Sequence, residues 1–327
     1  MSHLTYLEAS VVGLIQGVTE LFPVSSLGHN VLLPALIGGS WAKDLNVGSA
    51  ESPYLAFIVG LHVATAIALL IYFWRDWIRI IGGFLTSIRD RRVETTDQRL
   101  AWMVILATIP VGLVGLVFEH KFRTLFGKPV RAAIFLLING IIMYAGEKFR
   151  TRASLQADAR LAEERERAAG QTQRAGAAHA SGQRAVRQLE IVHAVEADER
   201  LAGAGFLQAL VIGAAQILAL FAGISRDGVT MVAGMARGLS REDAARFAFL
   251  LATPVILAAG VLKIPDLTGP LGRGIHGPIL VGSILSGVGA YVSVKYLVKY
   301  FQTRTLTPFA IYCLVVGLGS VIYLSVK

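Results

Sequence analysis

Cysteine and charged residues are both scarce in this 327-residue chain. Cys313 is the only cysteine, which excludes an intramolecular disulfide and a cluster of thiolate metal ligands. Asp, Glu, Lys and Arg make up 16% of the residues, whereas soluble domains use about a quarter. Because 54% of the residues are hydrophobic and the mean hydropathy is +0.59, we expect the chain to fold in a bilayer.

Seven apolar windows approach or exceed the length that crosses hydrocarbon, which is about 20 residues. They are Tyr54–Phe73, Leu100–Phe118, Ala132–Gly146, Leu201–Ser225, Phe247–Leu262, Ile275–Val294 and Leu306–Val326. One window could belong to a buried core helix, but seven indicate a multi-pass membrane protein. The N-terminus has no basic region before its apolar stretch and carries Glu8 and Glu20, so we do not expect a cleaved signal peptide.

The formal net charge of +9 is concentrated beside these windows. The basic groups that flank them are Arg75, Arg79, Arg89, Arg91 and Arg92, then Lys148, Arg150 and Arg152, and finally Lys295, Lys299 and Arg304. Such groups usually mark the cytoplasmic side of a membrane protein. Membrane topology therefore accounts for the positive charge, and we expect no nucleic-acid partner.

Residues 151–200 differ from the rest of the chain, with eight basic and eight acidic residues and few large apolar ones. We interpret them as a soluble cytoplasmic insertion, more simply a tolerated loop extension than a regulatory domain. The insertion divides the chain into 1–150 and 201–327.

These two parts share an internal repeat at an offset of 200 residues. Ala9, Val11, Gly13, Gln16, Ser25 and Gly28 recur as Ala209, Val211, Gly213, Gln216, Ser225 and Gly228. Each copy predicts an apolar helix of about four turns, a break, and a second short helix that a serine can cap. In the first copy, a cap at Ser26 would place His29 one turn inside the second helix.

The basic groups give a consistent topology only if residues 201–237 enter and leave the membrane on one side. Three full crossings would otherwise put Lys295 and Arg304 outside. Residues 4–38 would form the matching hairpin from the outer side. The predicted fold is thus all-α with an inverted repeat, each half being a re-entrant hairpin and three spans. Irregular backbone at that depth must be buried in protein or line a wet cavity, so the two breaks mark a site.

Polar residues that are costly in a membrane cluster at these breaks. They are Glu20, Ser25, Ser26 and His29 in the first copy and Ser225, Arg226, Asp227 and Thr230 in the second. Arg226, two helix N-termini and the hydroxyls of Ser225 and Thr230 predict a cradle for phosphate oxygens.

A carboxylate at Glu20 would repel phosphate unless it is protonated or a divalent cation lies between them, which points to chemistry rather than binding alone. Ser26 and His29 could be nucleophile and general base, or His29 could be the nucleophile with Ser26 as a supporting donor. Structural interpretations also exist: Glu20 or Asp227 could simply pair with Arg226, and His62 could be a helix-packing residue.

The first break, Gln16-Gly-Val-Thr-Glu-Leu-Phe-Pro-Val-Ser-Ser-Leu-Gly-His29, resembles the first signature of the bacterial undecaprenyl-diphosphatase family, also called bacitracin-resistance proteins. Gly223-Ile-Ser-Arg-Asp-Gly-Val-Thr230 resembles the second signature. Supporting stretches are Ala107–Phe118, Arg246–Pro254 and Pro308–Tyr312, so the likeness covers nearly everything outside the insertion.

The resemblance implies a phosphatase that converts undecaprenyl diphosphate to the monophosphate at the outer face of the bacterial inner membrane, with a divalent cation, Mg²⁺ or Ca²⁺. It assigns metal binding or proton transfer to Glu20, with Gln16 beside it, and charge stabilisation to Arg226. Ser26 and His29 would be nucleophile and base in either order.

Three positions depart from the family pattern: Ala222 replaces Pro, Asp227 replaces the second Ser, and His62 lies where a Gln is expected. Asp227 could weaken phosphate binding or recruit the cation. A lipid-phosphate or small-anion transporter and a non-catalytic paralogue that binds carrier lipid remain as alternatives. The sequence gives no indication of oligomeric state.

Overall fold

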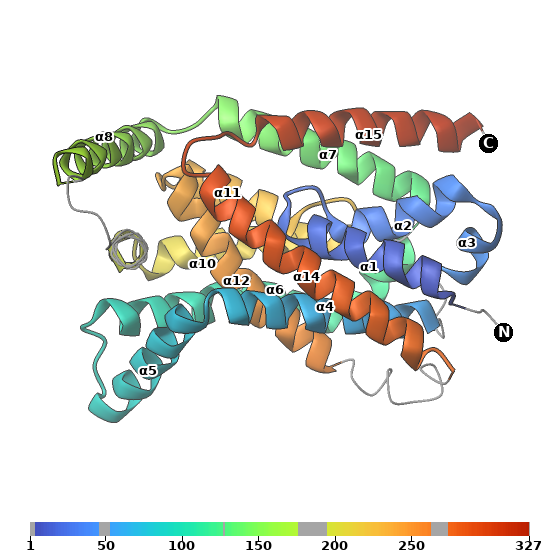
Figure 1. The fold of residues 1–327 in the computed structure, drawn as a ribbon, viewed down its shortest axis with the longest axis horizontal. Coiled ribbons are helices and arrows are strands. Elements are labelled where there is room, and N and C mark those ends of the chain that lie inside the picture. Colours follow the sequence, from blue (N-terminus) through green and yellow to red (C-terminus); the bar gives the residue numbers. More distant parts are fainter. Residues whose placement is uncertain (1–3, 46–52, 127, 176–194, 263–273, 327) are drawn as a thin grey trace.

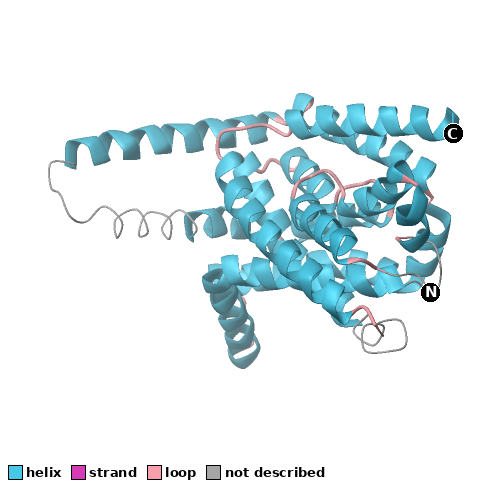
Figure 2. Ribbon diagram, turned by 45° about the vertical axis from the view of Figure 1, so that its right-hand side comes forward, coloured by secondary structure: helices cyan, strands magenta, loops and turns pink. Residues whose placement is uncertain are grey.

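The computed structural model describes residues 4–45, 53–126, 128–175, 195–262 and 274–326. Within these ranges all regular structure is helical, which confirms the all-α prediction (Figure 2). The first half contains α1 (Tyr6–Leu21), α2 (Ser26–Ile37), α3 (Gly39–Asp44), α4 (Pro53–Tyr72), α5 (Trp74–Asp90), α6 (Thr96–Phe126) and α7 (Pro129–Lys148). Then follow α8 (Arg152–Ala175), a helix over Val195–Gly203, α10 (Phe206–Ala214), the 3₁₀ helix η1 (Ala215–Leu220), α11 (Arg226–Ala236), α12 (Arg241–Leu262), α14 (His276–Tyr300) and α15 (Thr307–Val326).

Among the described residues, five helices are each long and apolar enough to cross a membrane. They are α6 over Thr96–Phe118, α7, α12, α14 and α15. Two helix pairs pass the same test together but are sharply bent: Phe57–Tyr72 with α5, by 85°, and Val195–Gly203 with Phe206–Leu220, by 95°. Counting each bent pair as one span gives up to seven, which agrees with a multi-pass membrane protein. The number of true crossings and the inversion of one half stay predictions.

Helix α5 was not predicted, because a window that averages hydropathy mixes its arginines with its apolar residues. Its exposed large side chains form one stripe at helical spacing, each more than half exposed: Trp74, Ile78, Ile81, Leu85 and Ile88. Such a helix, turned away from the preceding span, is typical of an element that lies along a membrane surface. Figure 1 shows α5 and the start of α6 as a hairpin at one end of the bundle.

Helices from the two halves pack against one another through small residues (Figure 1). Helix α1 lies along α14, α10 along α6, and α7 along α15. Gly13 and Gly213, which the repeat pairs, both occupy close crossings. A Cβ at Gly13 would lie 2.3 Å from the carbonyl oxygen of Gly282, and one at Gly213 would lie 2.1 Å from that of Ala107. Only glycine lets these backbones approach so closely.

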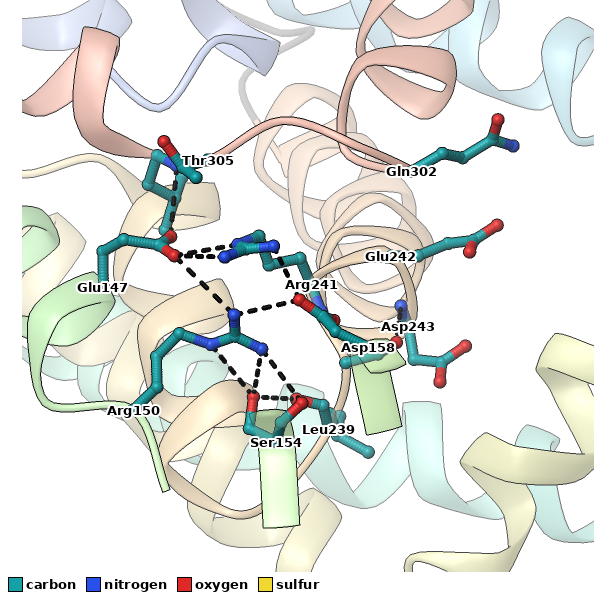
Figure 3. Close-up of polar contacts among 12 residues, drawn as sticks. Glu147, Arg150, Ser154, Asp158, Leu239, Arg241, Glu242, Asp243, Gln302 and Thr305 are labelled. Carbon is teal, nitrogen blue, oxygen red and sulfur yellow. Dashed lines mark hydrogen bonds and ion pairs between the residues drawn. The ribbon is translucent and has the colours of Figure 1, made fainter. Parts of the chain in front are cut away.

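Helix α8, the first part of the predicted insertion, is joined to the core by ion pairs and hydrogen bonds (Figure 3). Arg150 Nη1 and Arg241 Nη1 lie 2.9 Å and 2.6 Å from Asp158 Oδ2. Glu147, at the end of α7, accepts from Arg241 Nη2 at 2.7 Å. The Ser154 hydroxyl donates to the Leu239 carbonyl oxygen at 2.6 Å. The start of the segment therefore lies against α7 and the turn before α12. Residues 176–194 of the predicted insertion lie outside the described residues.

Candidate active site

The two chain breaks meet in the interior, and each begins its second helix with a serine cap. Ser25, not Ser26, caps α2: its Oγ accepts from the Gly28 N–H at 3.2 Å, and its φ is 68°. The same oxygen accepts from the Gly223 N–H, in the other break, at 3.2 Å. Because the cap lies one residue earlier than predicted, Ser26 becomes the first residue of α2 and its hydroxyl can reach another helix.

Ser225 caps α11 in the corresponding way, by accepting from the Gly228 N–H at 3.1 Å. A residue outside both motifs then joins the two breaks. Asn139 of α7, fully buried, accepts from the Ser225 N–H at 3.0 Å and donates to the Pro23 carbonyl oxygen at 3.1 Å. Nothing local in the sequence marks Asn139, except that it is a polar residue within an apolar window.

Glu20 lies at the centre of the site and is surrounded by donors. Its Oε1 accepts from Arg226 Nη2 at 2.8 Å. Its Oε2 accepts from Gln16 Nε2 at 2.8 Å and from the Ser26 hydroxyl. The Glu20 and Arg226 side chains are 5% and 13% exposed. The structure thus brings three predicted residues, Gln16 of α1, Ser26 of α2 and Arg226 of α11, together around the buried carboxylate of Glu20.

His29 faces a different partner. Its Nδ1 lies 2.8 Å from the Ser25 carbonyl oxygen, and its Nε2 lies 2.8 Å from the Tyr312 hydroxyl on α15. A carbonyl only accepts, so Nδ1 carries the hydrogen and Nε2 accepts from Tyr312. No hydrogen bond between Ser26 and His29 is among those of the described residues, so the predicted pairing of nucleophile and base is not formed. The group beside the Ser26 hydroxyl is Glu20.

Thr230, a predicted phosphate contact, and Asp227, which could weaken phosphate binding or recruit the cation, both contact Arg226 in this structure. The Thr230 hydroxyl donates to the Arg226 carbonyl oxygen at 2.7 Å, one turn back along α11. Asp227 Oδ1 lies 3.4 Å from Arg226 Nε, while its buried Oδ2 has no hydrogen-bond partner. Arg226 therefore contacts two carboxylates at the start of its helix, where an anionic ligand would also be favoured.

The described residues do not form a complete cation site. No group of three or more His, Cys, Asp and Glu side chains in the described ranges is placed to hold a metal ion. Both Glu20 oxygens already accept from donors, and one of these donors is the Arg226 guanidinium. Among the described residues, Asp227 Oδ2 is the one buried carboxylate oxygen without a hydrogen-bond partner. A divalent cation would therefore need ligands that these side chains do not supply.

Known proteins resemble this chain over nearly its whole length. The family model described as bacitracin resistance protein BacA matches residues 9–319. The undecaprenyl-diphosphatase of Mycolicibacterium paratuberculosis is 59% identical over 327 residues, covering 100% of this chain and 99% of the relative. Undecaprenyl-diphosphatase 2 of Frankia alni is 54% identical, with 97% of each chain covered. Undecaprenyl-diphosphatase 2 of Chromobacterium violaceum is 37% identical, covering 97% of this chain and 98% of the relative.

Proposed function

The chain belongs to the BacA family of bacitracin resistance proteins, and from this we propose that it hydrolyses undecaprenyl diphosphate to undecaprenyl phosphate and inorganic phosphate. It is then a membrane phosphatase that recycles the lipid carrier of cell-wall synthesis. The names of the relatives favour this activity over transport or non-catalytic lipid binding. The observation that carries the proposal is the hydrogen bond from the Ser26 hydroxyl to Glu20, whose other oxygen holds Arg226.

These contacts support Ser26 as the nucleophile. As its oxygen attacks the terminal phosphorus, the hydroxyl proton passes to Glu20 and the bond from phosphorus to the bridging oxygen breaks, which releases undecaprenyl phosphate. Water then hydrolyses the phosphoserine to inorganic phosphate and restores Ser26. Arg226 is placed to exchange its contact with Glu20 for the diphosphate oxygens, where it stabilises the charge of the transferred group. His29, held by Tyr312, is the second candidate nucleophile.

The activity and the nucleophile can be tested in one assay. We expect full-length protein in detergent to release phosphate from undecaprenyl diphosphate. In single turnovers with substrate labelled at the terminal phosphate, we expect an acid-stable adduct at Ser26. Protein that is inert with every cation would contradict the hydrolase, whereas an acid-labile adduct at His29 would keep the hydrolase and reverse the two roles.

We also propose that a divalent cation, Mg²⁺ or Ca²⁺, arrives with the diphosphate. Mg²⁺ commonly binds through substrate phosphates and one or two carboxylates, so Asp227, whose Oδ2 has no hydrogen-bond partner, would complete a site that the described residues do not form alone. Removal of cations by EDTA in the same assay tests this. Full phosphate release without any cation would contradict it.

We further propose that the protein lies in the bacterial inner membrane with its site open to the outer face and with the arginine-rich segments and the insertion in the cytoplasm. In a Cys313→Ala background, a membrane-impermeant maleimide added to spheroplasts should label Lys43→Cys but not Arg89→Cys. Both positions are exposed on the protein, so only the membrane should separate them. Labelling of Arg89→Cys without permeabilisation would reverse the orientation.

A further inference from the structure

A second imidazole lies beside Glu20. His62 of α4 places its Nε2 3.6 Å from Glu20 Oε2 and 3.4 Å from Gln16 Nε2. Its Nδ1 lies 2.9 Å from the Ile58 carbonyl oxygen. The His62 side chain is 24% exposed, whereas that of Glu20 is 5% exposed. His62 is therefore the more accessible of two titratable groups that nearly touch.

The surrounding hydrogen bonds determine which His62 nitrogen faces the site as an acceptor. The Ile58 carbonyl can only accept, so Nδ1 carries the hydrogen and Nε2 of the neutral ring is an acceptor. Asn30 Nδ2 donates to Gln16 Oε1 at 2.6 Å, which turns the Gln16 amide nitrogen toward Glu20 and His62. That nitrogen has two hydrogens, one for each acceptor.

Glu20 Oε2 and His62 Nε2 are thus two acceptors that face each other without a proton between them. Like acceptors at this distance repel, and a proton on either atom turns the repulsion into a hydrogen bond after a small side-chain movement. The Ser26 hydroxyl donates to the same Glu20 oxygen. Transfer of the Ser26 proton to Oε2 would supply the missing hydrogen at this position.

We propose that His62 is a proton-relay residue that takes from Glu20 the proton released by Ser26. The step rests on the proposed hydrolase. The Ser26 O–H bond breaks as its oxygen bonds to phosphorus, the proton goes to Glu20 Oε2, and it then passes to His62 Nε2. The resulting imidazolium returns the proton to water, which its partial exposure allows. Glu20 is then a carboxylate again for the hydrolysis of the phosphoserine.

No other charged group in the described structure competes for this proton. Glu20 of α1 is the only ion-pair partner of His62 there, and Arg226 of α11 lies on the opposite carboxylate oxygen. Helices α12 and α14 also pack on α4 near His62. Their residues that contact positions 63–65 are uncharged: Gly260, Ser286 and Gly287. Among the described side chains, His62 is therefore the one base placed to take the proton from Glu20 Oε2.

The test compares His62→Gln with wild type as full-length protein in detergent. Glutamine can keep the contact with Gln16 but cannot accept a proton. We expect kcat to fall about 10- to 100-fold with KM changed less than about two-fold, because general acid–base assistance by one group contributes about 10²-fold or more.

Two further variants separate a relay from a packing role. Added imidazole should raise kcat of His62→Ala, which leaves space for it, but not of His62→Gln. His276→Gln, an exposed histidine at the start of α14, should match wild type throughout. If His62→Gln does not fold, His62→Asn takes its place.

A folded His62→Gln or His62→Asn with wild-type kcat would overturn the relay, as would a folded His62→Ala that imidazole does not rescue. Either result leaves the hydrolase intact. Wild-type protein that releases no phosphate would instead remove the proposed function.

Discussion

Replacement of Glu20 by glutamine is expected to lower kcat for phosphate release by about 10²- to 10⁴-fold, the usual contribution of a positioned general base. Glutamine has nearly the same volume and can still accept from the Ser26 hydroxyl, but it does not take its proton. Arg226 would keep a carboxylate partner in Asp227, at 3.4 Å, so we expect the protein to stay folded. Phosphate release and the thermal midpoint in detergent measure the two effects separately.

Glu8 provides the matched control for Glu20, since it is a buried glutamate on the same helix. Its carboxylate accepts from the Thr5 N–H at 2.9 Å and completes a capping box at the start of α1. Glu8→Gln should keep that capping box, in which glutamine can take the place of glutamate, and leave kcat unchanged. Equal losses of kcat in Glu8→Gln and Glu20→Gln would mean that glutamate removal disturbs α1 rather than the chemistry.

Replacement of Arg226 by glutamine is expected to reduce both activity and stability. Loss of one group that stabilises transition-state charge typically costs about 10²- to 10³-fold in kcat. The change also leaves the Glu20 carboxylate buried without its cation, and breaking a buried ion pair in this way costs about 3–5 kcal/mol. The free energy of unfolding and kcat should therefore fall together in this variant.

The double variant Glu20→Gln with Arg226→Gln separates these two contributions. Both side chains are then neutral amides of similar length, so much of the lost stability should return because no unpaired charge from this pair remains. Activity should not return, since both the base and the guanidinium are absent. Recovery of kcat along with stability would show that the Glu20–Arg226 pair only supports the fold.

The predicted site residues were recognised individually, but their partners were not. Ser26 and His29 lie three residues apart, so the sequence places them on neighbouring positions of one helix turn. Their contacts come from other helices: Ser26 reaches Glu20, whereas His29 reaches Tyr312. Spacing along a helix fixes which side a residue occupies but not which element packs against that side.

The residues that were missed lie on helices distant in the sequence. Asn139 of α7 joins the two breaks, and His62 of α4, interpreted as a packing residue, lies beside Glu20. The only signal for either was a polar side chain within an apolar window, which helix packing explains equally well. Their positions beside the site become visible only when the helices are assembled.

Hydropathy and motif spacing are local properties, so the sequence alone was enough to predict a helical membrane protein of the BacA family with polar residues at two breaks. Three features became clear only from the assembled helices. Ser25 rather than Ser26 caps α2, and α5 is a helix that turns away from α4. Glu20 accepts hydrogen bonds from Gln16, Ser26 and Arg226 together. These features depend on contacts between segments up to 206 residues apart, which the packing of whole helices brings within hydrogen-bond distance.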